Sequence, residues 1–218
     1  MAYRFDCSEA AGRRRGIERA VVSVREGNLV VFPVDSSYGL GADAFSIEAV
    51  ARLRNLKGHG RHQPPPVLIG NARTLDGVAT SLTQAARDLV DAFWPGPLTV
   101  LCLAQPSLRW DLGDTAGTVA VRMPLHPVAL RLLADTGPMA VTGASAMGAR
   151  SQPQTCGEVR DAFGDAVEVY LDAGHLTRPE VSTIVDVTGL DGAAPRLLRV
   201  GALGVDRLRA VVPELIAG

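Results

Sequence analysis

The sequence predicts an α/β protein built on one mixed sheet with helices packed against it. Three observations lead to this class: short apolar runs that suit buried strands, longer segments with apolar residues at helical spacing, and the alternation of the two along the chain. Several expected strands follow one another too closely for a helical crossover, so some neighbours must pair antiparallel. We expect one domain, since no linker-like stretch divides the 218 residues.

The composition indicates a folded protein with a sizeable core. Hydrophobic residues make up 47% of the chain and charged residues 21%, a balance typical of globular domains. The formal net charge is −1, so a site for phosphate groups has to be built locally. We expect an N-terminal extension over residues 1–14, the main domain over residues 15–202, and a C-terminal helix of the same domain over residues 203–218.

Capping residues and prolines set the expected limits of several elements. Ser46 and Thr83 stand where helices would begin, and their hydroxyls can accept from a backbone N–H of the first turn. Pro33 is expected to end the first strand because it cannot donate to a ladder. The expected helices are residues 16–26, 46–56, 83–93, 127–134, 158–163 and 205–212, and the expected strands are residues 29–32, 67–69, 98–103, 118–122, 139–142, 167–171, 183–187 and 197–200.

The chain shows no pattern of secretion or of a membrane span. Its N-terminal segment is charged where a signal peptide needs an apolar core, and no run approaches the roughly 18 apolar residues of a spanning helix. Cys7, Cys102 and Cys156 are odd in number and lack CxxC spacing, which argues against a disulfide framework or a zinc site. We therefore expect a cytoplasmic protein without membrane association.

One segment stands out for its charge. Lys57 is the only lysine among 22 basic residues, and the loop that it opens, residues 57–66, adds His59, Arg61 and His62 between glycines. A compact ammonium and a guanidinium fork in such a loop can wrap phosphate groups. The alternative is that basic residues simply gather at a helix C-terminus, where the helix dipole favours them.

Further polar segments follow expected strands, the position at which α/β sheets hold their ligands. Each segment alone has an ordinary explanation, such as a turn or a surface arginine. Together they form a set of candidate ligand-binding segments. They are residues 33–40, 117–124, 141–148, and the pair 181–186 with 198–201. GxSxG, HExxH and GxGxxG motifs are absent, which leaves hydrolase, zinc-protease and dinucleotide-binding interpretations unsupported. The histidines lack metal-ligand spacing, and His126 is expected to begin a helix.

The order and spacing of these segments resemble the YrdC family of threonylcarbamoyl-AMP synthases, over about residues 15–202. The family's motifs PTDTVYGL, FWPGPLT, TVAVRxPxH, STIVD and LRxG correspond to residues 33–40, 93–99, 118–126, 182–186 and 198–201. The resemblance implies a YrdC-like single-domain α/β fold: a twisted mixed parallel and antiparallel sheet with flanking helices and a concave phosphate-binding cavity.

The resemblance also implies a reaction in which the protein itself forms few or no covalent bonds. Members of the family combine ATP, bicarbonate and L-threonine into threonylcarbamoyl-AMP for a tRNA modification and release pyrophosphate. Positioning and charge neutralisation would supply most of the catalysis. Mg²⁺ would accompany ATP by bridging phosphate oxygens, with no side-chain metal ligand assigned. The resemblance also implies tRNA-modifying proteins as partners, and weak RNA binding.

The resemblance assigns roles to individual residues. The catalytic positions are Lys57 and Arg61. The nucleotide positions are Lys57, His59, Arg61, Gln63, Thr118, Ser145, Ser151 and Arg199, and the amino-acid positions are Ser36, Tyr38, Leu68, Arg122, Thr142, Gly143 and Ser182. Among these, Arg122 is suited to holding the carboxylate of the amino acid.

The chain departs from the family pattern at four places. The KxR motif reads Lys57-Gly-His59, which removes an arginine that Arg61 can replace. The SxN motif reads Gly143-Ala-Ser145, which loses the first hydroxyl and the amide. Leu68 stands where a histidine is common, and Ser36 replaces a threonine. Each lost hydrogen bond to a charged group costs on the order of 1.5–3 kcal/mol. Three such losses would slow the parent reaction unless the pocket compensates.

Two alternatives follow from these departures. The first is a YrdC-like paralog that forms a different carbamoyl or N-carboxy-amino-acid adenylate, because Leu68 favours a more apolar acceptor. The second is a non-catalytic nucleotide- or RNA-binding module, because the SxN motif is lost and the basic loop can serve backbone phosphates.

Overall fold

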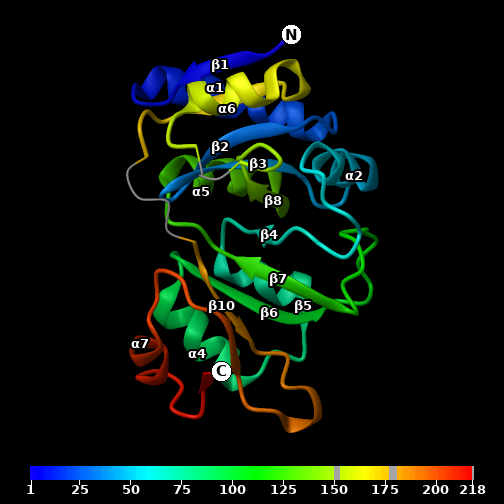
Figure 1. Cartoon of the computed structure of the whole chain (residues 1–218), viewed down its shortest axis with the longest axis vertical. Coiled ribbons are helices and arrows are strands. Elements are labelled where there is room, and N and C mark those ends of the chain that lie inside the picture. The colour runs from blue at the N-terminus through cyan, green and yellow to red at the C-terminus, as the bar shows by residue number, and fades with distance from the viewer. Residues whose placement is uncertain (150–152, 177–180, 218) are drawn as a thin grey trace.

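The chain folds around a sheet that runs from one end of the molecule to the other (Figure 1). The computed structural model describes residues 1–149, 153–176 and 181–217. The strands are β1 (Tyr3–Asp6), β2 (Val30–Val34), β3 (Ser37–Asp43), β4 (Val67–Leu68), β5 (Ala79–Thr80), β6 (Leu98–Ala104), β7 (Thr118–Arg122), β8 (Met139–Gly143), β9 (Val169–Asp172), β10 (Thr183–Asp186), β11 (Arg196–Arg199) and β12 (Ile216–Ala217). The helices are α1 (Ala10–Arg25), α2 (Ile47–Leu56), α3 (Leu75–Val78), α4 (Gln84–Phe93), α5 (Pro127–Thr136), α6 (Cys156–Phe163) and α7 (Val205–Arg209), with 3₁₀ turns at Ala72–Thr74, Gly164–Ala166 and Leu190–Gly192.

The sheet is mixed, which confirms the predicted fold class. Within the described residues the strand order is β1-β9-β2-β3-β8-β4-β7-β6-β10-β11-β12, with β5 beside β6. Parallel pairs join β1 to β9, β9 to β2, β4 to β7, β6 to β10, and β11 to β12. The other neighbours pair antiparallel. The short strand β4 therefore connects the half of the sheet that holds β8 to the half that holds β7.

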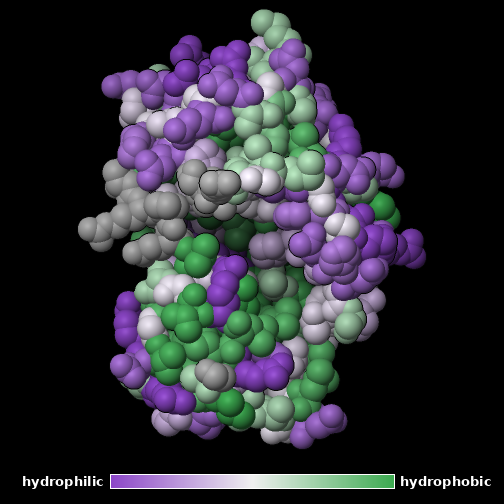
Figure 2. Space-filling view, in the orientation of Figure 1, coloured by the Kyte–Doolittle hydropathy of each residue, from purple (hydrophilic) through white to green (hydrophobic). Residues whose placement is uncertain are grey.

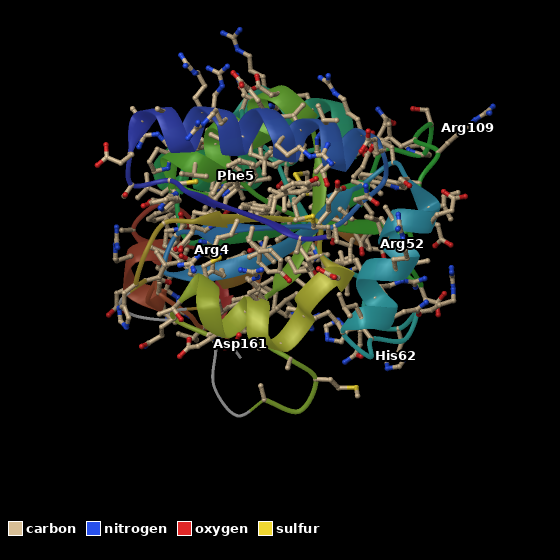
Figure 3. All side chains as sticks on the ribbon, turned by 90° about the horizontal axis from the view of Figure 1, so that it is seen from above. Arg4, Phe5, Arg52, His62, Arg109 and Asp161 are labelled. Carbon is tan, nitrogen blue, oxygen red and sulfur yellow. The ribbon has the colours of Figure 1, made fainter. Side chains whose placement is uncertain are left out.

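Apolar residues on the strands alternate between two cores, one on each face of the sheet. On β2, Val30 and Phe32 belong to the core beneath α1 and α5, whereas Val31 belongs to the larger core that α2, α4 and α6 cover. Figure 3 shows α1 on one side of the sheet and α2 and α6 on the other. Burial on both faces explains why the strands read as continuous apolar runs and not as an alternation of apolar and polar residues.

Three expected helix starts are confirmed by their capping bonds. The hydroxyls of Ser46 and Thr83 accept from the backbone N–H three residues on, at 3.2 Å and 3.1 Å. His126 accepts at Nδ1 from the N–H two residues on, at 3.2 Å, and α5 begins directly after it. Each cap satisfies one of the N–H groups that the first turn of a helix leaves unpaired.

The prediction that Pro33 ends the first strand is wrong. β2 continues to Val34, and Pro33 pairs with Tyr38 of β3. The parallel partner β9 pairs only with Val30 and Val31, so the missing N–H of Pro33 interrupts no ladder. β3 itself was not predicted, because its glycines and polar residues read as a turn.

Both ends of the chain join the sheet. Within the expected extension of residues 1–14, β1 pairs in parallel with β9, and α1 already begins at Ala10. The expected helix over residues 203–218 is short, because α7 ends at Arg209 and β12 then pairs with β11. Pro213 lies between the two and cannot continue a helix.

Thr183 fixes β10 against the segment that follows β11. Its hydroxyl is buried, donates to the carbonyl oxygen of Leu203 at 2.8 Å and accepts from the N–H groups of Gly201 and Leu203, both at 3.0 Å. We expect Thr183→Val, which keeps the shape and removes these bonds, to lower the free energy of unfolding by about 1–3 kcal/mol in chemical denaturation.

Thr80→Val is the matched control for this substitution. Thr80 is half-buried on β5, and its side chain makes no hydrogen bond with any residue the structure describes. The control should change the free energy of unfolding by less than about 0.5 kcal/mol. Equal losses in the two variants would contradict the assigned role of the Thr183 hydroxyl.

Candidate active site

A cavity of about 280 Å³ opens where the ends of the central strands meet. Figure 2 shows the surface hollowed near its centre, at the level of β4 and β7 in Figure 1. The lining residues come from both halves of the sheet: Val34, Ser37, Tyr38, Gly39, Pro66, Leu68, Thr99, Arg122, Val141, Thr142, Gly143, Val181, Ser182 and Arg199. Seven of them were predicted as site residues, so polar segments that are distant in the sequence do meet in one place.

Arg122, at the end of β7, has a guanidinium that is largely buried, with its side chain 12% exposed. Nε donates to the carbonyl oxygen of Gly96 at 3.1 Å, and Nη2 pairs with the carboxylate of Asp35. Burial lowers the pKa of Arg122 and the Asp35 carboxylate opposes this, so the group stays charged at neutral pH. Nη1 has no hydrogen-bond partner among the described residues. A guanidinium with one free edge is suited to bind a carboxylate or phosphate.

Arg199 lines the same cavity from the end of β11. Its Nε and Nη2 donate to the carbonyl oxygen of Ser182 at 3.0 Å and 2.8 Å, and Nη2 reaches the Ser182 hydroxyl at 3.1 Å. That hydroxyl lies 2.8 Å from Thr99 Oγ1 on β6. Burial lowers the pKa of Arg199, and the charge of Arg199 contributes to lowering that of Arg122. Two like charges share one cavity, an arrangement that favours an anionic ligand.

Two glycines allow the strands to come close enough to form this cavity. A Cβ at Gly201 would lie 2.3 Å from the carbonyl oxygen of Val181, so a side chain there would separate the segment after β11 from the start of β10. A Cβ at Gly39, in the cavity wall, would lie 2.7 Å from the side chain of Val34 and 2.9 Å from that of Val141. Both glycines are therefore required by close contacts.

The cavity also has an apolar wall. Leu68 is 3% exposed and lines the cavity together with Val34 and Val141, and all three belong to the core beneath α1 and α5. Tyr38 lines the cavity too, but its hydroxyl donates to the carbonyl oxygen of Gly174 at 2.7 Å. Burial raises the pKa of Tyr38, so this hydroxyl stays protonated and serves the scaffold.

Lys57 lies beside the cavity and is not part of its lining. It follows α2 and is 6% exposed, and its Nζ donates to the carbonyl oxygen of Ser145 and to Ser145 Oγ, the latter at 3.2 Å. Ser145 follows shortly after Gly143, which lines the cavity. Burial lowers the pKa of Lys57. Two of the predicted nucleotide positions, Lys57 and Ser145, are thus in contact next to the amino-acid positions of β8.

Two other predicted nucleotide positions are engaged elsewhere. Arg61 pairs with Asp111 at 2.8 Å and with Asp114 at 3.0 Å, and its side chain is 53% exposed. To replace the missing arginine of the KxR motif, Arg61 would have to leave both carboxylates. The Thr118 hydroxyl donates to the carbonyl oxygen of Thr115 at 2.7 Å. Neither side chain lines the cavity.

The remaining predicted positions lie around the site or outside the described chain. His59 is half-buried, and burial followed by the charge of the neighbouring ammonium lowers its pKa, so the imidazole is neutral at neutral pH. Gln63 is exposed on the loop after α2. Ser36 is half-buried at the tip of the β2–β3 hairpin, where Ser37 lines the cavity in its place. Ser151 lies outside the described residues.

The sequence did not identify seven of the fourteen lining residues, Thr99 among them, nor Asp35 and Arg54 outside the lining. Asp35 and Thr99 lie inside the motifs at residues 33–40 and 93–99, but a motif does not tell which side chains face each other across the fold. Arg54, in the last turn of α2, is 9% exposed, and its Nε and Nη1 have no partner among the described residues. Its position on the helix face was predicted as neither core nor site.

The described residues contain no group of three or more histidines, cysteines, aspartates or glutamates that could hold a metal ion. The polar groups of the cavity are guanidiniums and hydroxyls, which do not suit Mg²⁺ as a resident ligand set. The cysteines are buried and free, and burial raises the pKa of Cys7 to about 11 and those of Cys102 and Cys156 to about 12. In that same part of the chain no helix has the length and apolar character needed to cross a bilayer.

Comparison with known proteins shows similarity to one family over nearly the whole chain. A family model for Sua5, YciO and YrdC, described as "Telomere recombination", matches residues 23–201. A protein of Mycobacterium tuberculosis named putative threonylcarbamoyl-AMP synthase is 48% identical over 212 residues, which is 97% of this chain and 96% of the relative. The threonylcarbamoyl-AMP synthase of Pyrococcus abyssi is 34% identical over 193 residues, 88% of this chain and 56% of the relative.

Solved structures agree with the sequence matches. P. abyssi Sua5 complexed with L-threonine aligns with a TM-score of 0.88 at 30% identity, over 100% of this chain and 62% of that protein. E. coli YciO shares the fold, with a TM-score of 0.83 at 22% identity over 95% of this chain and 100% of that protein. With its motifs in order and its cavity formed by them, the chain belongs to the Sua5/YciO/YrdC family.

Proposed function

We propose that this chain condenses ATP, bicarbonate and L-threonine into threonylcarbamoyl-AMP, releases pyrophosphate, and so supplies the activated group for a tRNA modification. The observation that carries the proposal is the meeting of Arg122 and Arg199 with the hydroxyls of Thr99 and Ser182 in one small cavity. The most similar relatives reported above are named as synthases of this compound, and the archaeal relative binds L-threonine.

The size of the cavity divides the site into two parts. At about 280 Å³ it is at the lower limit of small-molecule pockets, so it suits an amino acid and not a whole nucleotide. The free edge of Arg122 would take the carboxylate, and the apolar wall at Leu68 would take the methyl group of threonine. The triphosphate of ATP would extend along the end of β8 toward Lys57, whose ammonium is compact enough to serve as a point charge.

The chemistry needs no bond to the protein. Bicarbonate gives CO₂ and hydroxide, and the neutral amine of threonine attacks the carbon of that CO₂ to form a carbamate. The proton that the amine loses combines with the hydroxide to give water. A carbamate oxygen then attacks the α-phosphorus of ATP, and the bond to the bridging oxygen breaks, so that pyrophosphate leaves with the electron pair. The cations of the site would hold the reactants in line and stabilise the charge on the phosphates.

Mg²⁺ enters this proposal only as a complex with ATP. The described residues offer no carboxylate cluster that would hold the ion by itself, and Mg²⁺ is usually bound through substrate phosphates and water. Its contribution would be to neutralise phosphate charge. The product is a mixed anhydride that water can hydrolyse, so we include in the proposal a transfer to tRNA-modifying proteins in the cytoplasm, where ATP and tRNA are present.

Pyrophosphate release with a panel of amino acids tests the proposal. We expect release from ATP and bicarbonate to depend on L-threonine, and kcat/KM for L-threonine to exceed that for L-serine about ten-fold because the methyl group packs on the apolar wall. L-valine should be poorer still, because the cavity hydroxyls of Thr99 and Ser182 would bind the hydroxyl of threonine, and a site that binds this group rejects an analogue without it. No threonine-dependent release would refute the proposal, and a preference for L-valine would favour the paralog with a more apolar acceptor.

Lys57→Ala tests the assigned phosphate site. We expect pyrophosphate release to fall by about a hundred-fold or more, since a positioned charge on the reacting phosphates is lost. Lys57→Arg should fall at least ten-fold, because a guanidinium fork does not fit a buried point-charge position. Circular dichroism should report an intact fold in both, and Arg87→Ala, which removes an exposed ion pair with Asp76, is the control. Unchanged turnover in Lys57→Ala would place the phosphate site elsewhere.

A further inference from the structure

One carboxylate, that of Asp35, faces a guanidinium of the cavity. Asp35 opens the two-residue turn between β2 and β3, in which Val34 pairs with Ser37. Its φ is +53°, in the left-handed region that glycine adopts most easily and that aspartate tolerates better than most residues. A glycine would form the same turn with less strain, so the aspartate is explained by its side chain and not by the turn.

The two carboxylate oxygens of Asp35 have different partners. Oδ1 accepts from the backbone N–H groups of Leu125 and His126, at 2.6 Å and 2.9 Å, and so ties the hairpin to the start of α5. Oδ2 accepts from Arg122 Nη2. The side chains of this pair are 17% and 12% exposed, so solvent screens the contact much less than it screens a surface ion pair.

These contacts determine how the Arg122 guanidinium is presented. Nε is held by the carbonyl oxygen of Gly96, and the neighbouring Nη2 is held by the carboxylate of Asp35. A single hydrogen bond would leave the plane free to turn, whereas two bonds fix it. Nη1 is then the part of the guanidinium left for a ligand in the cavity that Arg122 lines.

We propose that Asp35 is a positioning residue for the amino-acid substrate: it fixes the plane of the Arg122 guanidinium so that the free edge meets the substrate carboxylate. Asp35 itself does not touch the substrate. The proposal rests on the proposed function, which makes Arg122 the ligand of that carboxylate. The negative charge of Asp35 also reduces the repulsion between Arg122 and Arg199, which share the cavity.

Asp35→Asn separates the two tasks of the side chain. The amide oxygen of asparagine can still accept the two backbone hydrogen bonds that Oδ1 accepts in the parent protein. The amide nitrogen cannot accept a hydrogen bond from Arg122. We expect KM for L-threonine to rise about ten-fold or more, and KM for ATP to change less than about three-fold. The thermal midpoint should stay close to that of the parent protein. Asp76→Asn, which breaks the exposed pair with Arg87, is the matched control and should change neither KM.

A double-mutant cycle tests whether Asp35 acts through Arg122. In an Arg122→Gln background, Asp35→Asn should cause no further rise in KM for L-threonine or in the calorimetric Kd for L-threonine. A purely structural role in the hairpin would instead add its effect to that of Arg122→Gln and lower the thermal midpoint. An unchanged KM for L-threonine in the single variant Asp35→Asn, or additive effects in the cycle, would overturn the proposal.

Chemical modification separates a failure of this inference from a failure of the proposed function. Phenylglyoxal reacts with accessible guanidiniums, and peptide mass mapping reports its rate at Arg122 without any substrate. We expect Asp35→Asn to raise that rate several-fold and leave the rate at Arg87 unchanged. Equal rates at Arg122 in both proteins would refute the positioning role even if L-threonine is the substrate. A raised rate in a protein without threonine-dependent turnover would refute only the proposed function.

Discussion

The site depends on one interaction that its three cations share: each donates to a backbone carbonyl oxygen, which leaves the charge in place. The contacts are Gly96 O with Arg122, Ser182 O with Arg199, and Ser145 O with Lys57. Arg122 also pairs with the carboxylate of Asp35. The exposed side chains of Arg61, Arg87 and Arg131 are held by carboxylates instead. A carbonyl dipole satisfies a donor without cancelling its charge, so a chain of net charge −1 keeps a positive cavity that an anionic ligand can neutralise.

Retaining this charge costs stability, and the fold is arranged to support it. Burial lowers the pKa of Lys57, Arg122 and Arg199 alike, which means that the folded protein disfavours their charged forms. The cores on the two faces of the sheet supply the opposing stabilisation. β8 connects the two parts of the site, because its end lines the cavity and the residues after it reach Lys57. A bound anion would relieve the penalty and stabilise the folded state.

Local signals predicted the elements, whereas contacts between distant segments had to come from the structure. The strand at residues 118–122 and the helix after Ser46 were predicted with their observed limits, because an apolar run and a cap are both local patterns. β3 was missed because its burial depends on β2 and β8 and not on its own composition. For the same reason the pairing of Arg61 with Asp111, across two loops, and that of Asp35 with Arg122 could not be read from the motifs.

Two of the four departures from the family pattern fall on the side where the nucleotide is expected, and the other two, Leu68 and Ser36, fall at amino-acid positions. The missing KxR arginine and the altered SxN motif both lie near the contact between Lys57 and Ser145, whereas Arg122, Arg199 and Ser182 are retained in the cavity. A triphosphate with its own Mg²⁺ offers many oxygens, so the loss of one protein donor can be compensated by another contact. An amino-acid carboxylate has only two oxygens and depends on a single oriented guanidinium. This difference explains why the chain can vary on the phosphate side while Arg122 stays held at two points.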